Sequence, residues 1–377
     1  MDLRYRDDQL AVRDAVRAFV RERIVPRAAG WSEQGEFPLA LLPELAAVGL
    51  TGLTIPAEHG GSGVDTLTAA LVAEELGAGD GSIALTLAAH NALCIGHLLT
   101  AASSGQQERW LPPLAKGAHL GAWALTEPSS GSDAVSAKTT ARKDGDGWIL
   151  NGQKQFITNG SIAHFTVVIA ATAERRLTAF GVSADNPGLS AGKREKKMGL
   201  WASDTAQLVL RDCRVPDRDR IGAVGAAFGD VRAVLDRGRI GIGALAIGLG
   251  RAALETATAY ARERTQFGKA LAEFQMIQWK LVQSRTELDA GRLLIHRAAS
   301  LADAGQPFGR AAAMAKLYAT EAASRAANAC LQVLGGYGYL RDYPIERIVR
   351  DARLMEIGEG TSEIQRIVIA RDLVAAS

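Results

Sequence analysis

One carboxylate near the C-terminus stands in an unusual sequence setting. Within ARLMEIGEGTSEIQR (352–366), Glu359 lies between two glycines, just before the expected start of a helix. Ser362, with Gln365 three residues later, predicts a capping box for that helix, but the cap does not account for the carboxylate in front of it. Glu359 is therefore either a solvated loop residue or a group that accepts or donates a proton in a reaction.

The cysteines and histidines do not form a recognisable reactive or metal-binding set. Cys94, Cys213 and Cys330 lie far apart without CxxC spacing, and an odd number of cysteines cannot all pair within the chain, which favours a reducing compartment. The six histidines show no HxxxH spacing, so we expect no metal site. A Ser-His-Asp triad can have any spacing, but no GxSxG segment supports one.

The segment GIGALA (241–246) matches GxGxxA, the glycine fingerprint of dinucleotide-binding folds. That fingerprint binds a pyrophosphate only where it follows a strand and opens a helix. The residues before it, VLDRGR (234–239), are charged and continue a helical pattern, so the sequence does not favour a nicotinamide cofactor.

Helical periodicity is typical of the first 120 residues. Apolar residues at 12, 16, 19, 20 and 24 form a helical stripe, which we expect Pro26 to end. Further helices are expected at about 38–49, 65–78, 82–101 and 104–116.

The pattern changes to short strands near Gly121 and returns to helices near residue 226. KTTARKDGDGWILNGQKQFITNG contains DGDG and NG, which are typical turn signals of β-hairpins. From 226 the pattern predicts one long helix despite five glycines between 238 and 250. Each glycine costs up to about 1 kcal/mol relative to Ala unless close helix packing offsets it. Further helices are expected at about 272–303, 307–334 and 362–375.

These patterns predict an α+β fold with three domains. They are an N-terminal α-helical domain (1–120), a middle β domain (121–225) and a C-terminal four-helix bundle domain (226–377).

Charge and hydropathy limit the classes of partner. Lys plus Arg exceed Asp plus Glu by 43 − 41 = 2, which argues against nucleic-acid binding. The longest apolar run, 240–250, is about half the roughly 20 residues that span a bilayer, and no secretory signal is visible. We therefore expect a cytoplasmic protein without membrane insertion.

Four further stretches occur in an order that is similar to one enzyme family. They are WALTEPSSGSDAVS (123–136), QKQFITNG (153–160), RTQFGKALAEFQ (264–275) and QVLGGYGYLRDYPIERIVRD (332–351). Together with the Glu359 stretch, they resemble the acyl-CoA dehydrogenases from about residue 5 to residue 375. LDRGRIGIG (235–243) and the overall length are most similar to the short-chain, butyryl-CoA dehydrogenase type.

The resemblance implies an acyl-CoA dehydrogenase-like fold, FAD as the cofactor, and α,β-desaturation of an acyl-CoA thioester to the trans-2-enoyl-CoA. Members remove the α-proton with a Glu that precedes Gly-Thr, and a hydride passes from the β-carbon to flavin N5, so Glu359 is implied as the base. Burial between flavin and acyl chain raises the pKa of such a carboxylate and strengthens it as a base. Electron-transfer flavoprotein is implied as the electron acceptor, and a homotetramer as the assembly.

Other positions for the base are less consistent with the sequence. Isovaleryl-type members carry it on the long helix, at the position that matches Gly238, which cannot act as a base. Glu356 and Glu363 are alternatives by proximity only. We expect Glu356 to close a helix or pair with Arg353, and Glu363 to border the flavin at the start of the last helix.

The resemblance also implies ligand contacts. The turn Trp123–Ser132 and the strand end Phe156–Thr158 are expected against the isoalloxazine ring. Arg264 and Gln275 resemble residues that reach a neighbouring subunit's FAD, and Gln332–Gly336 resembles a turn at the adenylate end. The residues expected to bind the cofactor are Trp123, Leu125, Thr126, Gly131, Ser132, Phe156, Ile157, Thr158, Arg264, Phe267, Gln275, Gln332, Val333, Gly335, Gly336, Thr361 and Glu363. Those expected to bind the substrate are Ser132, Asp236, Arg239 and Gly360.

Two residues depart from the family pattern. Many members have Trp where this chain has Phe156, which still supplies a ring but no indole N–H. Many also have Tyr before the catalytic Glu, where this chain has Gly358. A missing phenol in the acyl cavity favours a branched or bulkier chain, so we expect a short- or medium-chain substrate, straight or branched.

Two other interpretations keep the fold and change the task. An acyl-carrier-protein dehydrogenase of a biosynthetic pathway, or an oxidase that uses O₂, would share the flavin site. A non-catalytic assembly protein on the same fold is a third hypothesis, which the intact Glu359 and flavin motifs argue against.

Overall fold

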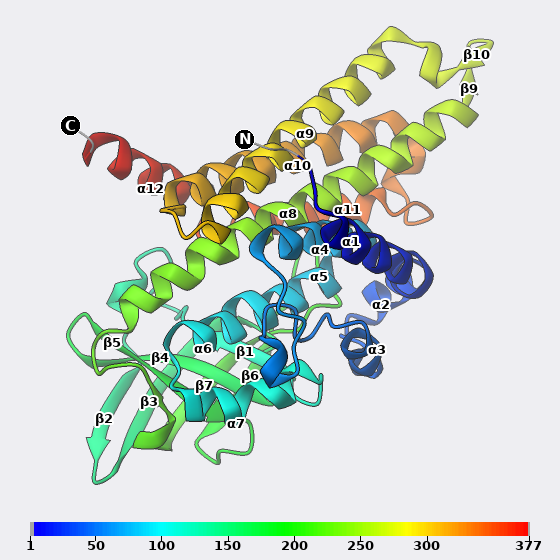
Figure 1. Cartoon of the computed structure of the whole chain (residues 1–377). Coiled ribbons are helices and arrows are strands. Elements are labelled where there is room, and N and C mark those ends of the chain that lie inside the picture. The colour runs from blue at the N-terminus through cyan, green and yellow to red at the C-terminus, as the bar shows by residue number, and fades with distance from the viewer. Residues whose placement is uncertain (1–3, 376–377) are drawn as a thin grey trace.

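The computed structural model describes residues 4–375. The strands of residues 121–221 gather at one end of the molecule and the long C-terminal helices at the other, with N-terminal helices packed between them (Figure 1). This arrangement of helices at both ends of the chain around a central sheet confirms the α+β fold class.

Short polar side chains start several N-terminal helices. The Asp65 carboxylate accepts a hydrogen bond from the Thr68 N–H at 2.8 Å, and the Asp80 carboxylate caps the next helix. The helices are α1 (Asp7–Phe19), α2 (Ala28–Gln34), α3 (Leu42–Ala47), α4 (Thr66–Gly79), α5 (Gly81–Ala88), α6 (Gly96–Ala101) and α7 (Ser104–Ala115).

Pro26 does not end the first helical segment, contrary to our expectation. After α1 the chain continues through a π turn (Val20–Ile24) and a 3₁₀ turn (Val25–Arg27) into α2. Proline lacks the N–H of a regular α-helix, so the chain changes helix type at this point and continues as a helix.

Strands from the middle of the chain form an 8-stranded sheet in the order β6-β7-β3-β2-β4-β5-β8, with β1 paired to β4. The pairs β1–β4 and β2–β4 are parallel. The strands are β1 (Gly121–Ala124), β2 (Thr140–Asp144), β3 (Gly147–Thr158), β4 (Phe165–Ala173), β5 (Arg176–Ser183), β6 (Leu189–Arg194), β7 (Thr205–Pro216) and β8 (Arg220–Ile221).

The turn signals in this region had different outcomes. DGDG joins β2 to β3 as a tight hairpin, with Gly145 at a φ of 58°. Asn151–Gly152 was expected to be a turn but lies inside β3, where the register with β7 shifts at a bulge. Asn159–Gly160 forms the turn after β3. A Gly in a strand is a known mark of a bulge, which explains the wrong prediction.

The C-terminal third consists of long helices joined by short links. These helices are α8 (Ala227–Glu263), α9 (Gln275–Asp303), α10 (Gly309–Leu334), α11 (Ile345–Met355) and α12 (Ser362–Ala375). A small hairpin of β9 (Thr265–Gln266) and β10 (Lys269–Ala270) joins α8 to α9 and projects from the end of the two helices (Figure 1). A helix ending at Glu356 was expected without bounds and corresponds to α11, whereas the strands of this hairpin were not predicted.

Close packing accounts for most of the glycines in α8. A Cβ on Gly248 would run into the Glu74 carbonyl of α4, and one on Gly250 would meet Leu288 of α9. On α4, Gly77 faces Leu245 of α8 in the same way, with its would-be Cβ 3.0 Å from the Leu245 Cα. The two helices therefore approach closely enough that their backbones are in contact, which offsets the low helix propensity of glycine.

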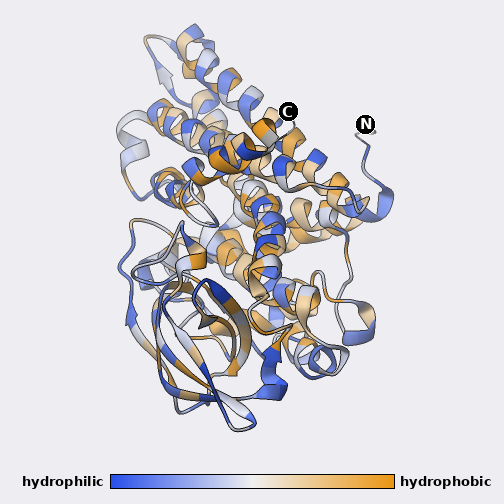
Figure 2. Cartoon of the chain, turned by 90° about the vertical axis from the view of Figure 1, so that its left-hand side faces the viewer, coloured by the Kyte–Doolittle hydropathy of each residue, from blue (hydrophilic) through white to orange (hydrophobic). Residues whose placement is uncertain are grey.

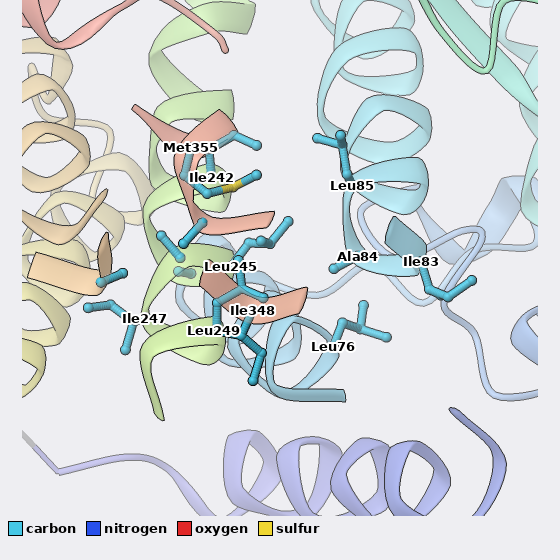
Figure 3. Close-up of a cluster of buried hydrophobic side chains, with 14 of the residues drawn as sticks. Leu76, Ile83, Ala84, Leu85, Ile242, Leu245, Ile247, Leu249, Ile348 and Met355 are labelled. Carbon is cyan, nitrogen blue, oxygen red and sulfur yellow. The ribbon is translucent and has the colours of Figure 1, made fainter. Parts of the chain in front are cut away.

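The main core lies where α8 meets the helices around it. Figure 3 shows Leu76 of α4, Leu85 of α5, Leu245 of α8 and Ile348 of α11 in one buried cluster. Apolar residues concentrate along the helix faces that point toward one another (Figure 2). Separate apolar clusters lie inside the sheet and between the sheet and α6, α7 and the start of α8.

Two helical segments, Gly81–Ala101 and Ala227–Glu263, are long and apolar enough to cross a membrane by length and composition. Their most apolar windows are each 67% buried inside the protein, as the core helices of a folded domain are.

The packing of α4 on α8 gives a stability prediction. Gly248→Ala should lower the free energy of unfolding by about 1–3 kcal/mol, because the new methyl would lie 2.7 Å from the Ala78 backbone N and force the helices apart. Thermal and urea unfolding measure this. Gly229→Ala is the matched control, since its Cβ meets nothing within 4 Å in the first turn of α8. Equal stability of the two variants would contradict the packing argument.

Candidate active site

Glu359 sits in the short loop between α11 and α12. The N–H groups of Ile357 and Gly358 donate to the Leu354 carbonyl and end α11. Glu359 then adopts a φ of 52°, in the left-handed region that a residue with a side chain rarely occupies. Such strain persists only where the surroundings impose it, and it is frequent at functional sites. The pairing of Arg353 with Glu356 at 2.8 Å just before this loop confirms that expectation.

Two side chains hold the loop by donating hydrogen bonds to the Gly360 carbonyl. Lys316 of α10 donates from Nζ at 2.9 Å, and Gln365 of α12 donates from Nε2 at 2.8 Å. Gln365 also donates to the Glu359 carbonyl at 3.3 Å. Gly360 has a φ of 92°, and a Cβ there would lie 2.8 Å from Gln365 Nε2, so both its conformation and its neighbour require glycine.

The carboxylate of Glu359 lies against α8 at Gly238. A Cβ on Gly238 would fall on Glu359 Oε2 and lie 3.0 Å from Cδ, and the Leu93 side chain is close on the other side. Oε2 is buried and has no hydrogen-bond partner. The position that carries a base in isovaleryl-type members therefore faces the same point in space, and here its missing side chain makes room for Glu359.

The environment of Glu359 makes it a stronger base than an ordinary carboxylate. Burial raises the pKa of Glu359 to about 7, although the Lys316 ammonium and the Arg239 guanidinium act in the opposite direction. Desolvation thus outweighs the two cations. Lys316 is itself fully buried, and burial lowers its pKa to about 8.

The cap of α12 differs from the expected capping box. The Thr361 hydroxyl accepts from the Ile364 N–H at 3.3 Å, so Thr361 and not Ser362 is the capping residue. Ser362 Oγ is buried without a hydrogen-bond partner, and Gln365 turns back to hold the Gly360 carbonyl. The sequence pattern was correct about the helix start and wrong about which residues make it.

A buried ion pair supports the turn that follows β1. Lys154 of β3 is fully buried and donates from Nζ to the Leu125 carbonyl at 3.0 Å and to Glu127 Oε1 at 2.7 Å. Glu127 also accepts from the backbone N–H groups of Lys138 and Thr139. Burial alone would raise the pKa of Glu127, but these donors and the ammonium hold it below its ordinary value. The ion pair thereby fixes the Leu125–Glu127 backbone.

The two segments expected at the flavin ring lie side by side. The Gln155 N–H donates to the Thr126 carbonyl at 2.8 Å. Phe156 follows at a bulge in β3, has a φ of 59°, and leaves 62% of its surface exposed. Trp123 is instead buried, with Nε1 donating to His97 Nδ1 at 3.4 Å. An exposed ring held by a strained backbone beside Thr126 fits a planar apolar cofactor such as a flavin.

The residues expected at the other end of the cofactor form a second cluster. A hollow of about 590 Å³ is lined by Arg264, Val333, Gly335 and Gly336, among others. Arg264 lies over the Tyr337 ring at 5.7 Å. Phe267, at the hairpin tip, is 93% exposed, and Gln275 begins α9. Figure 1 places this β9–β10 end of the molecule away from the sheet that carries Thr126 and Phe156.

The residues expected to bind substrate lie near two different features. Asp236 and Arg239 are one turn apart on α8, form an ion pair, and flank Gly238; Arg239 is buried. Ser132 is exposed three residues before Val135, where a second hollow begins. That hollow has a volume of about 1210 Å³ and lies between β2 and the β4–β5 hairpin. Its charged lining residues are Lys138, Arg142, Lys143, Glu174, Arg175 and Arg176.

Sequence reasoning missed the residues that act from beneath the site. Lys154 and Lys316 occur in helical or strand patterns where a lysine normally faces water, so periodicity gave no signal for either.

Comparisons with known proteins agree with the motifs. The chain matches the N-terminal domain (residues 6–118), the middle domain (122–213) and the C-terminal domain (228–374) of acyl-CoA dehydrogenase. It is 42% identical over 367 residues to the short-chain specific acyl-CoA dehydrogenase of Rattus norvegicus, covering 96% of this chain and 89% of that protein. It is 39% identical to the short-chain specific acyl-CoA dehydrogenase of Clostridium acetobutylicum, covering 98% and 99%.

Solved structures give the same result. Butyryl-CoA dehydrogenase of Megasphaera elsdenii is 38% identical with a TM-score of 0.97, covering 99% of this chain and 100% of that one. A chain solved in work on the electron transferring flavoprotein of Acidaminococcus fermentans has the same identity, TM-score and coverage. A prolyl acyl carrier protein oxidase, AnaB, is 33% identical with a TM-score of 0.93, covering 98% and 100%.

The buried pair beneath the turn gives a second stability prediction. Lys154→Met should destabilise the protein by about 3–5 kcal/mol, because it leaves the Glu127 carboxylate buried without its cation. Chemical unfolding measures the loss. The double variant Glu127→Gln/Lys154→Met should be less destabilised than Lys154→Met alone, because no charge is then left unpaired. A double variant that is less stable than Lys154→Met alone would contradict this account.

Proposed function

The chain belongs to the acyl-CoA dehydrogenase family and is an oxidoreductase of the short-chain type, and we propose that Glu359 is the base that removes the α-proton of its acyl-CoA substrate. The observation that carries the proposal is the placement of the Glu359 carboxylate: Oε2 is buried, lacks a hydrogen-bond partner, and lies against a glycine that leaves it room. A carboxylate held in this way is free to accept a proton from a bound substrate.

The proposed reaction converts a saturated acyl-CoA to the trans-2-enoyl-CoA. Glu359 accepts the α-proton, two electrons leave with the β-hydrogen as hydride, and the α,β double bond forms. A pKa of about 7 makes Glu359 basic enough to accept the proton and leaves a substantial ionised fraction at neutral pH. The Glu359 backbone N–H, turned by the left-handed φ, is the proposed donor to the thioester carbonyl, where negative charge develops.

FAD is the proposed cofactor, and when bound it supplies the acceptor for the hydride. A glutaryl-CoA dehydrogenase structure of Mycobacterium smegmatis in complex with FADH2, 32% identical to this chain with a TM-score of 0.94 over 98% of it and 95% of that chain, supports this choice. Phe156 would cover the flavin, whereas the Ile157 side chain is buried in the sheet and would contact it only through the backbone. Thr126 and Thr158 would hydrogen-bond to the flavin, and Thr361 with the start of α12 would complete the site.

The basic hollow favours a CoA thioester over a thioester that lacks phosphate groups. Five of its six charged lining residues are Lys or Arg. A volume of about 1210 Å³ is sufficient for a phosphorylated nucleotide, and guanidinium groups are well suited to bind phosphate. We propose that this hollow takes the nucleotide end of CoA, with the pantetheine passing Ser132.

The acyl group is proposed to be short or medium in length, straight or branched. A Cβ on Gly358 would come no closer than 3.7 Å to any atom, which is the Leu354 carbonyl oxygen. The position therefore has room for the side chain that many relatives carry, and the glycine leaves that room open. Activity restricted to unbranched chains would contradict the branched alternative.

Electron-transfer flavoprotein is the proposed electron acceptor, which the similarity to a chain studied with such a flavoprotein supports. The alternative is an acyl-carrier-protein dehydrogenase or an oxidase. The similarity of this chain to the prolyl acyl carrier protein oxidase AnaB supports that alternative. Peroxide formation with an acyl-CoA identifies an oxidase, and inactivity toward every free CoA thioester identifies a carrier-protein enzyme.

The proposed assembly is a homo-oligomer, and specifically a tetramer. The two clusters expected to contact one FAD lie at separate ends of the folded molecule. One subunit would therefore supply Arg264 and Gln332–Gly336 to its neighbour's cofactor. Phe267, Met276 and Trp279 are exposed near this end, as residues of an interface would be. A monomeric mass of 39.8 kDa in light scattering would exclude the assembly. A cytoplasmic location is likewise a proposal, which cell fractionation tests.

The first experiment is an anaerobic titration of the flavin-loaded protein with straight and branched acyl-CoAs, followed by flavin absorbance. One chain class should bleach the flavin of the wild type. Glu359→Gln should bind the same thioester but reduce the flavin at least about 10³-fold more slowly, since it keeps the volume of the side chain and removes the base. Normal reduction rates in Glu359→Gln exclude Glu359 as the base.

The basic hollow gives a further prediction. Lys138→Ala/Arg175→Ala should raise KM for an acyl-CoA by about tenfold, because two phosphate-binding cations are lost. KM for the corresponding acyl-pantetheine, which has no nucleotide, should not change. Lys193→Ala, on β6 at the far edge of the same sheet, is the matched surface control. An equal effect on both substrates would refute the assignment of the hollow.

A further inference from the structure

We propose that Lys316 is a positioning residue for the base: it holds the peptide that carries Glu359, and its positive charge stabilises the Glu359 carboxylate. This inference rests on the proposed role of Glu359. It adds a residue 43 positions away on another helix, in a segment that none of the recognised motifs includes.

Lys316 reaches the loop of Glu359 from inside the bundle. Lys316 lies on α10 with its side chain fully buried, and its Cα is 3.6 Å from where a Cβ on Gly243 of α8 would be. Its Nζ donates to the Gly360 carbonyl at 2.9 Å. The hydrogen bond therefore ties the loop between α11 and α12 to the interior of the bundle.

The Glu359 carboxylate is held in place indirectly. Glu359 Oε2 has no hydrogen-bond partner, so the position of the carboxylate depends on the backbone and on contact with Gly238. That backbone is in the left-handed region, which is unfavourable for Glu. The Gly360 carbonyl bonds are the contacts that impose this conformation, because they fix the orientation of the next peptide plane.

The charge of Lys316 also acts on Glu359. The charged groups that act on Lys316 are Glu359, Glu356, Glu363 and Arg239, and those that act on Glu359 are Lys316 and Arg239. Two cations oppose the effect of burial on the pKa of Glu359, and Lys316 has the larger effect of the two. Without it, burial would raise that pKa further and leave less of the base ionised at neutral pH.

Packing alone does not explain a lysine at this position. A fully buried ammonium loses its hydration, which is costly unless the charge is paired and hydrogen-bonded. A Met of similar length would fill the same space without that cost. The Lys316 ammonium instead lies at the Glu359 loop. There it supplies a hydrogen bond and a positive charge, neither of which an apolar side chain could supply.

The test is the pH dependence of kcat/KM for flavin-loaded Lys316→Met, measured with the best acyl-CoA. Removal of a cation disfavours the carboxylate, so the acidic limb of the profile should move to higher pH by about one unit. At pH 7, kcat should fall by about tenfold or more, because the base is both less ionised and less well positioned. Flavin content and molar mass, measured on the same samples, establish that the variant is assembled.

Gln365→Met is the matched control, because it removes the other donor to the Gly360 carbonyl without changing charge. It should lower kcat and leave the acidic limb where the wild type has it. Lys316→Arg retains the charge and should also leave the limb in place. If Lys316→Met does not accumulate with flavin, Lys316→Gln against Lys316→Arg makes the same comparison of neutral with cationic side chains.

Two results overturn the inference. One is a neutral Lys316 variant with full flavin content whose acidic limb matches the wild type, and the other is such a variant with wild-type kcat. Reduced thermal stability with an unchanged profile would assign Lys316 a merely structural role. Failure of the proposed function is a separate outcome, since it would show as normal turnover in Glu359→Gln.

Discussion

The contact between the Glu359 carboxylate and α8 at Gly238 constrains much of the molecule. A side chain at 238 would occupy the space of the carboxylate, so the helix must carry glycine there. The loop must also present Glu359 from the left-handed region, which requires Gly360 and its two hydrogen-bond donors. Since α8 is packed by α4, α9, α10 and α11, the position of this one contact is fixed by the main core of the protein.

The electrostatics of the site follow from a competition between burial and charge. Lys316 and Arg239 favour the ionised carboxylate, and desolvation favours the neutral one more strongly, so the pKa of Glu359 rises to about 7. A fully exposed Glu would be ionised but weakly basic, and a buried Glu without cations would be basic but protonated at neutral pH. Partial compensation by two nearby cations therefore suits the proposed role of Glu359, because it leaves a carboxylate that is both more basic than usual and partly ionised at neutral pH.

Local patterns and motifs predicted different parts of this structure. Periodicity located the long helices, and the DGDG turn located one hairpin, because these depend on nearby residues. The motif around Glu359 identified the loop, but it assigned the cap to Ser362 when Thr361 makes it. Asn151–Gly152 gave the signal of a turn and forms a bulge, since neighbouring strands continue on both sides. Lys316 and Lys154 make contacts with residues distant in sequence, which no local pattern reports.

The separation of the two cofactor clusters also follows from the fold. Phe156 lies in the sheet and Thr126 in the turn after β1, whereas Arg264 is at the end of α8, a helix of 37 residues. At 1.5 Å per residue such a helix spans roughly 55 Å, longer than a dinucleotide can bridge along it. The sheet of one subunit and the β9–β10 end of another can serve the same cofactor only if they are brought together by assembly. In the proposed assembly, the exposed Phe267 and Trp279 would offer apolar surface for that contact, so cofactor binding and oligomer formation would depend on each other.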